Sequence, residues 1–225
     1  MSNDYNEVLR RLKEERERMS LSQREMCRHV GMSQGQYCKI EKGEQHFSFD
    51  EVKALSESGV DIHYIFTGKK ANSRYIRDFE TCDFKEIICL LEAIYSALTY
   101  HCALTPSEFW RNLYQEAQYI RLLDANQNFE NNLFMLLRHL KGYTQKKMAV
   151  QFGMDTKKLR MLEKGQCLPD SEILWQFYSD FRVPPSILLK DRNGLLNEAG
   201  WLLEKIESES KNDITAIVKA FQKKD

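Results

Sequence analysis

Apolar residues recur every three or four positions along most of this chain, with polar residues filling the positions between them. This spacing places the apolar side chains on one face of a helix. Residues 83–100 give a long example, because Ile87, Leu91 and Leu98 share one face and Asp83 can cap the helix start. No segment shows the sustained alternation that strands require. The pattern therefore predicts an all-α fold.

A second start signal follows this helix. Thr105–Glu108 is a capping box with proline at the first helical position, and its helix is expected to run to about Leu123. The two helices would form an antiparallel hairpin whose apolar surface favours a homodimer interface, the alternative being packing within the chain. Residues 69–82 are predicted to be a polar linker. In the tail, a seam for packing or dimerisation is formed by Leu195, Ala199, Leu202 and Ile206, followed by a short helix over residues 214–221.

The chain contains an internal repeat. At an offset of 122 residues, residues 21–43 align without gaps on residues 143–165. The identical pairs are Gln23/Gln145, Met26/Met148, Gly31/Gly153, Met32/Met154, Glu41/Glu163, Lys42/Lys164 and Gly43/Gly165. A gap-free match of this length predicts that both segments fold in the same way.

Each repeated segment has the pattern of a helix, a tight turn and a second helix. Ser22 and Thr144 are good N-cap residues for the first helix of each segment. A glycine ends that helix, where a left-handed conformation is least costly. Ser33 and Asp155 then cap the second helix two residues later. In the two segments the buried faces are expected to hold Met26, Val30, Tyr37 and Ile40, and Met148, Phe152, Leu159 and Leu162.

Both segments, with their flanks, resemble the lambda-repressor-like (Cro/XRE-type) helix-turn-helix domain, a bundle of five short helices. The resemblance covers residues 7–68 and 128–189, and the flanks of the first segment look most like bacterial and prophage repressors. It implies two such bundles joined by a helical hairpin, with a C-terminal helical tail. The expected parts are a first unit (residues 1–70), a linker and hairpin (71–127), a second unit (128–190) and the tail (191–225).

The resemblance also implies which residues face DNA. In this family the glutamine that opens the second helix contacts a phosphate, and the start of the third helix faces base edges in the major groove. Carried onto the first unit, the DNA-binding residues are Gln23, Arg24, Arg28, Ser33, Gln34, Gly35, Gln36, Lys39 and Lys42. In the second unit they are Gln145, Lys146, Lys147, Thr156, Lys157, Lys158, Arg160 and Lys164. Since the two sets differ almost everywhere, the units should not read the same half-site.

Charge supports a polyanion-facing surface in one place. The chain has 33 basic and 33 acidic side chains among 225 residues, yet residues 131–190 carry ten basic and five acidic groups. The basic block at 138–164 fits a DNA-facing surface, although a solvated helix face would have the same composition. A charged N-terminus and the lack of a long apolar run predict a cytoplasmic protein with no membrane segment. The resemblance to bacterial and prophage repressors implies that a bacterium or phage encodes it.

Motifs for other chemistry were not found. The six cysteines form no CxxC pair and the five histidines have no ligand spacing, so no metal, cofactor or enzymatic activity is expected. Each histidine is predicted to be a solvated helix residue, and Cys27, Cys38 and Cys89 to be inert packing residues. The expected function is a sequence-specific regulator of transcription on double-stranded DNA, of the repressor type, acting as a homodimer by occluding a promoter. The alternative is an adaptor with one DNA-binding unit and one unit that docks a protein such as an antirepressor or antitoxin partner.

Overall fold

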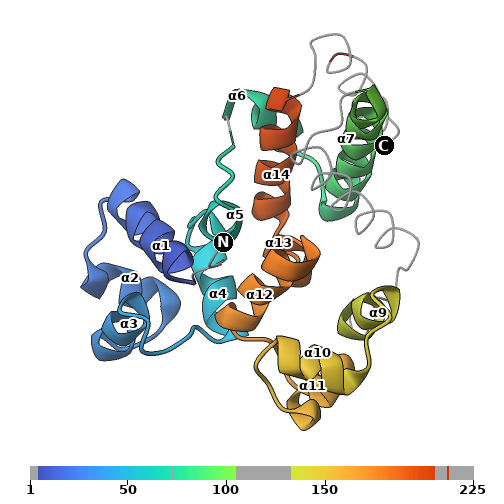
Figure 1. The fold of residues 1–225 in the computed structure, drawn as a ribbon. Coiled ribbons are helices and arrows are strands. Elements are labelled where there is room, and N and C mark those ends of the chain that lie inside the picture. The colour runs from blue at the N-terminus through green and yellow to red at the C-terminus, as the bar shows by residue number, and fades with distance from the viewer. Residues whose placement is uncertain (1–4, 72, 105–132, 206–211, 213–225) are drawn as a thin grey trace.

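The computed structural model describes residues 5–71, 73–104, 133–205 and 212, and every regular element within these ranges is helical (Figure 1). The chain begins with α1 (Asn6–Arg18), α2 (Gln23–Val30), α3 (Gln34–Glu41), α4 (Phe49–Glu57) and α5 (Ile62–Thr67). The middle contains α6 (Ser73–Ile76), the 3-10 helix η1 (Arg77–Phe79) and α7 (Phe84–Leu104). The last part contains α9 (Leu133–Leu140), α10 (Gln145–Gln151), α11 (Thr156–Glu163), α12 (Ser171–Phe181), α13 (Pro185–Leu188) and α14 (Arg192–Lys205). The prediction of an all-helical chain is confirmed for the described residues.

Helices α1–α5 enclose a common apolar core. The predicted stripe residues Met26 and Tyr37 are completely buried there, together with Leu12 of α1, Val52 of α4 and Ile65 of α5. Burial of these side chains is the main stabilising contribution, because isolated helices of eight or nine residues are marginal in water. The short helices α2–α5 therefore depend on one another for their stability.

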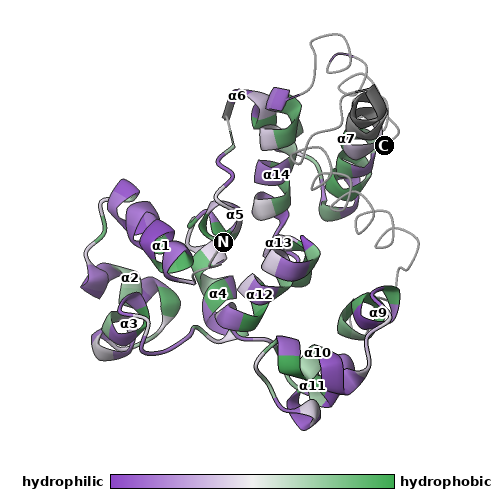
Figure 2. Ribbon diagram, in the orientation of Figure 1, coloured by the Kyte–Doolittle hydropathy of each residue, from purple (hydrophilic) through white to green (hydrophobic). Residues whose placement is uncertain are grey.

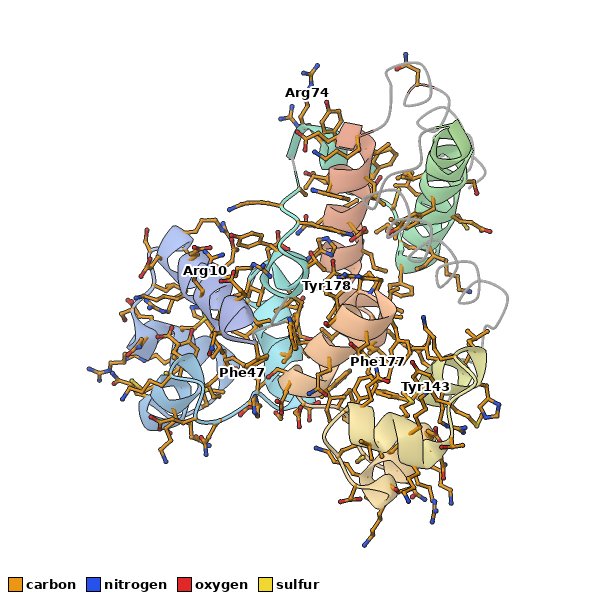
Figure 3. The ribbon with its side chains drawn as sticks, in the orientation of Figure 1. Arg10, Phe47, Arg74, Tyr143, Phe177 and Tyr178 are labelled. Atoms are coloured by element: carbon orange, nitrogen blue, oxygen red, sulfur yellow. The ribbon has the colours of Figure 1, made fainter. Side chains whose placement is uncertain are left out.

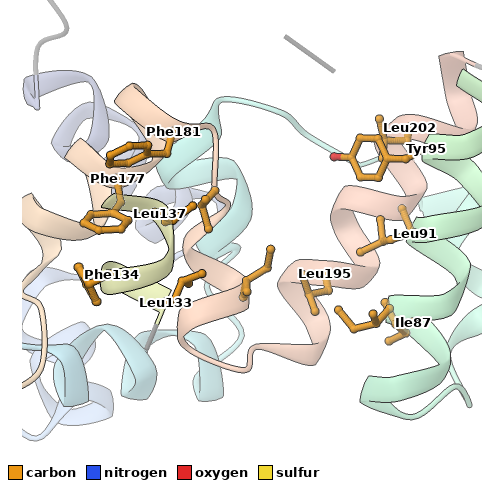
Figure 4. Packing of buried hydrophobic residues seen from close by; sticks show 14 of the residues in the cluster. Ile87, Leu91, Tyr95, Leu133, Phe134, Leu137, Phe177, Phe181, Leu195 and Leu202 are labelled. Atoms are coloured by element: carbon orange, nitrogen blue, oxygen red, sulfur yellow. The ribbon is translucent and has the colours of Figure 1, made fainter. Parts of the chain in front are cut away.

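Helices α9–α13 lie at positions equivalent to those of α1–α5 at the offset of 122 residues. This correspondence includes α9, α12 and α13, which lie outside the aligned segment at residues 143–165. Helix α11 begins and ends at positions equivalent to the bounds of α3, and α10 begins at the position equivalent to the start of α2. The predicted stripe is buried here too, with Met148 and Leu159 completely inaccessible to solvent. Around it, three phenylalanine rings pack together (Figure 4). The ring centroids of Phe134 and Phe177 are 4.1 Å apart, and those of Phe177 and Phe181 are 5.3 Å apart. The backbone geometry of the repeat thus extends into its flanks.

Helix α7 packs along α14 and forms the other end of the same buried cluster (Figure 4). The prediction of a helix from 83 to 100 is correct, but the helix continues to Leu104, and Asp83 forms a capping box with Glu86. The predicted tail seam is buried against α7 and α6 within the chain, with Leu195 and Leu202 at 0% exposure. The helix predicted for residues 105–123, residue 206 of the seam, and residues 214–221 lie outside the described residues.

The segment predicted to be a polar linker is more ordered than expected. Residues 69–82 include α6 and η1, and Phe79 and Cys82 are buried in the cluster around α7 and α14. The Arg192 guanidinium donates a hydrogen bond of 2.6 Å from Nε to the carbonyl of Cys82. The linker prediction was based on local composition, whereas these two side chains are buried in a cluster that includes α14, a helix more than 100 residues later in the sequence.

Candidate nucleic-acid interface

Helices α2 and α3 are joined by the tight turn that the sequence predicted. Ser22 caps α2 and Ser33 caps α3, each through a capping box with the residue three positions later. Between the helices Gly31 has φ of 71°, a left-handed conformation in which a side chain would be strained. These contacts fix the angle between the two helices, which is the requirement for presenting α3 in a groove.

Most residues predicted to face DNA in the first unit are exposed on these helices. Arg24 and Arg28 lie on α2, whereas Ser33, Gln34, Gly35, Gln36 and Lys39 lie on or just before the first turns of α3, and Lys42 follows it. Figure 2 shows hydrophilic and hydrophobic positions alternating along α2 and α3. The exposed set contains four cations and two amides, groups that suit phosphate oxygens and base edges respectively.

Two glutamines have intramolecular roles that the sequence did not reveal. The Gln36 carboxamide oxygen accepts hydrogen bonds from the Ser33 backbone N–H at 3.2 Å and from its hydroxyl at 2.9 Å. Gln23 is half-buried and donates from Nε2 to Glu41 at 2.5 Å, while its oxygen accepts from the Cys38 thiol at 3.3 Å. Gln36 thus stabilises the start of α3 and Gln23 ties α2 to α3. Their contacts with DNA stay predictions.

A buried ion pair holds α1 against α3. Arg16 Nε lies 2.8 Å from Glu41 Oε1, and the two side chains are only 10% and 9% exposed. Arg16 also donates from Nη1 to the carbonyl of Leu21, at the lead-in to α2, over 2.9 Å. Burial opposes the charge on Arg16, but the Glu41 carboxylate outweighs it and raises the pKa of the guanidinium. With Gln23, this network joins three helices behind the exposed face.

The same network occurs at the equivalent positions of the later helices. Arg138 of α9 pairs with Glu163 of α11, and its Nη1 donates to the carbonyl of Tyr143 at 3.2 Å. Gln145 donates from Nε2 to Glu163 at 2.6 Å. Figure 3 labels Tyr143 at the lead-in to α10. Each of these residues stands 122 positions after its counterpart Arg16, Leu21, Gln23 or Glu41. Helices of equal length would not by themselves produce two buried networks with the same donors and acceptors. The repeat therefore includes side-chain contacts as well as helix positions.

The exposed face of α10 and α11 is more basic than that of α2 and α3. Its exposed cations are Lys146, Lys147, Lys157, Lys158, Arg160 and Lys164, whereas Thr156 and Gln145 are half-buried. Two of the lysines also make contacts within the chain. Lys158 Nζ lies 3.3 Å from Asp170, and Lys147 Nζ lies 4.2 Å from the centre of the Tyr143 ring. Both lysines are exposed, so these contacts are weak and leave the side chains accessible.

The structure corrects two expectations about histidine and cysteine. His63 is completely buried and pairs with Glu198, so its prediction as a solvated residue is wrong. Cys89 is exposed, so it is not a packing residue, whereas Cys27 is buried as predicted. Within the described ranges, no group of three histidine, cysteine or acidic side chains could hold a metal ion. Among the helices described, none is long and apolar enough to cross a membrane.

Sequence reasoning missed Arg16 and Arg138. They lie outside the segments that align best, at residues 21–43 and 143–165, and a charged residue near the end of a helix is usually solvated. A signal was nevertheless present, because the two arginines are identical at the same offset of 122.

Comparison with known proteins agrees with this geometry in the N-terminal part of the chain. The family model described as a helix-turn-helix domain matches residues 7–57, which span α1 to α4. No curated protein and no solved structure matched the chain. The match and the exposed, capped pair α2–α3 together support a DNA-binding regulator with a helix-turn-helix domain at residues 7–57.

Proposed function

We propose that this chain is a sequence-specific regulator of transcription that binds double-stranded DNA through two helix-turn-helix units and represses by occluding a promoter. The observation that carries the proposal is the repetition of the Arg16–Glu41–Gln23 network as Arg138–Glu163–Gln145. The first member of this repeat lies in the segment that matches the helix-turn-helix domain. The second unit, of the same Cro/XRE type, is inferred from the first.

The chemistry of the two faces gives each unit a different role. The face of α3 offers amides and one cation, a composition suited to reading base edges, where Gln34 would bind adenine through donor and acceptor together. The face of α11 offers several cations, which neutralise phosphates and can also bind guanine. Binding by both should be sensitive to salt, because each neutralised phosphate releases counterions.

A charge-reversal experiment tests the proposal without knowledge of the operator. Full-length protein is titrated with a pool of random duplexes at several salt concentrations. Arg24→Glu with Arg28→Glu should weaken binding and flatten its salt dependence. The matched control is Arg77→Glu with Lys205→Glu, an equal charge change beside α6 and at the end of α14, away from α2 and α3 in Figure 1. Equal losses from the two pairs would contradict a DNA-binding role for α2.

The second unit is tested in the same titration. Lys157→Glu with Lys158→Glu should weaken binding as well, relative to the same control pair. If binding and its salt dependence stay unchanged, the second unit does not contact DNA. That result would favour the adaptor in which this unit docks a protein.

A further inference from the structure

The two sets of repeated helices contact each other through equivalent elements. Helix α5 packs against α13, and these helices occupy equivalent positions at the offset of 122 residues. Leu174 of α12 and Leu189, which follows α13, belong to the same buried cluster as Ile65 and Phe66 of α5. A contact between equivalent elements of two similar units is the arrangement of an isologous dimer interface. Here both units belong to one chain.

Buried hydrogen bonds specify how the two sets fit together. The backbone N–H of Phe47 donates to the Ser171 hydroxyl at 3.0 Å, and the backbone N–H of Ser171 donates to the Phe47 carbonyl at 2.9 Å. The Tyr5 hydroxyl lies 2.6 Å from the same Ser171 oxygen. Ser171 is 1% exposed and Phe47 is 3% exposed. A displacement of α12 against the N-terminal helices would leave these buried polar groups unsatisfied, which is costly.

Helix α14 contributes an ion-pair cluster that also holds α5 in place. Glu198 is completely buried, with Oε2 2.8 Å from His63 Nε2 of α5 and Oε1 3.2 Å from Lys69 Nζ. The Tyr95 hydroxyl of α7 donates to the same carboxylate at 2.9 Å. Lys69 also lies 4.7 Å from the centre of the Trp201 ring. These contacts connect the N-terminal helices, α7 and α14 in one unit.

From this interface we infer that one molecule acts as a built-in dimer whose two unlike heads are held at a fixed separation. The inference rests on the proposed function of both units. In Figure 1, α2–α3 and α10–α11 lie on opposite sides of the joined α4 and α12. Its DNA target is therefore one duplex with two dissimilar half-sites and a single preferred gap between them. A flexibly tethered pair of heads would instead accept many gaps.

The test uses the full chain and duplexes selected from a random pool. The two parts of the selected motif are re-synthesised with the gap changed by one to five base pairs. A change of about five base pairs turns one half-site to the opposite side of the duplex, since a turn is about 10 base pairs. We expect affinity to fall about 100-fold, because only one head can then bind. Native mass spectrometry should show one chain on the parent duplex.

A pair of interface variants tests the cause of the gap preference. Ser171→Ala removes the hydroxyl that bonds Phe47 and Tyr5, and should reduce the penalty for altered gaps. Ser58→Ala, the same change at a hydroxyl that donates to the carbonyls of Ala54 and His29 within the N-terminal helices, should keep the penalty of the wild-type chain. If Ser171→Ala fails to fold, the gap series with the unmodified chain still decides the inference.

Each other outcome is also informative. Equal affinity at all gaps with one chain bound would overturn the fixed separation. A palindromic motif, or two chains on the parent duplex, would overturn the built-in dimer and favour pairing between copies. The absence of any selected motif would instead remove the proposed function, and with it this inference.

Discussion

Replacement of Arg16 by methionine tests whether the buried network positions α3. The change keeps an unbranched apolar side chain in place of the arginine stem but leaves the Glu41 carboxylate, 9% exposed, without its cation. Breaking a buried pair by removal of one partner costs about 3–5 kcal/mol. Because Glu41 keeps its hydrogen bond from Gln23, we expect the lower end, about 3 kcal/mol.

The double variant distinguishes an ion-pair effect from general damage to the core. Arg16→Met with Glu41→Leu removes both charges and fills the space of the ion pair with two apolar side chains. No buried carboxylate is then left without a cation. We expect the double variant to be less destabilised than the sum of the single variants by about 2 kcal/mol, a typical coupling for residues in contact. The equivalent changes at Arg138 and Glu163 should behave in the same way.

Urea unfolding followed by far-UV circular dichroism measures these differences, and hydrogen exchange of α3 amides locates them. Arg10→Met is the matched control, because Arg10 is on the same helix and makes only exposed ion pairs with Glu7 and Glu14. Its unfolding midpoint should equal that of the wild-type chain. The reasoning is refuted if Arg16→Met resembles Arg10→Met, or if the double variant shows the full sum of the single losses.

Further predictions concern pH and the turn of the first unit. Lys69 and His63 outweigh the effect of burial and lower the pKa of Glu198 from its ordinary 4.5, so its contribution to stability is present above that value and is lost as the pH falls below it. Glu198→Gln should flatten the dependence of the unfolding midpoint on pH in this acidic range; an unchanged slope would contradict the assignment. Gly31→Ala should destabilise by about 1 kcal/mol because its φ is 71°. Gly35→Ala, with no atom within 4 Å of the added carbon, should stabilise α3 by up to about 1 kcal/mol and yet weaken DNA binding. Unfolding midpoints that change in the same direction in both glycine variants would contradict the expected loss at Gly31 and gain at Gly35.

Local signals in the sequence were sufficient for the helix-turn-helix pattern. The caps at Ser22 and Ser33 and the left-handed Gly31 depend on residues three or four positions apart, and all three occur as predicted. The same applies to Asp155, whose carboxylate accepts from the backbone N–H of Lys158 at 2.7 Å. Where backbone geometry alone determines the residue type, sequence reasoning was accurate.

Contacts between distant segments were not accessible in this way. His63 and Glu198 are 135 positions apart, and nothing near His63 indicates that an acidic partner will cover it. Ser171 reads only as an early residue of a helix, yet its hydroxyl bonds Phe47 in another part of the chain. The interface between the two sets of helices therefore had to come from the structure.

The most direct test of the central claim is selection of random duplexes by the full-length chain, followed by sequencing of the bound fraction. The account predicts a long recurring motif built from two unlike parts, one of which is lost with Gln34→Ala and the other with Lys157→Glu and Lys158→Glu. Recovery of unenriched sequences by the wild-type chain would contradict sequence-specific DNA binding.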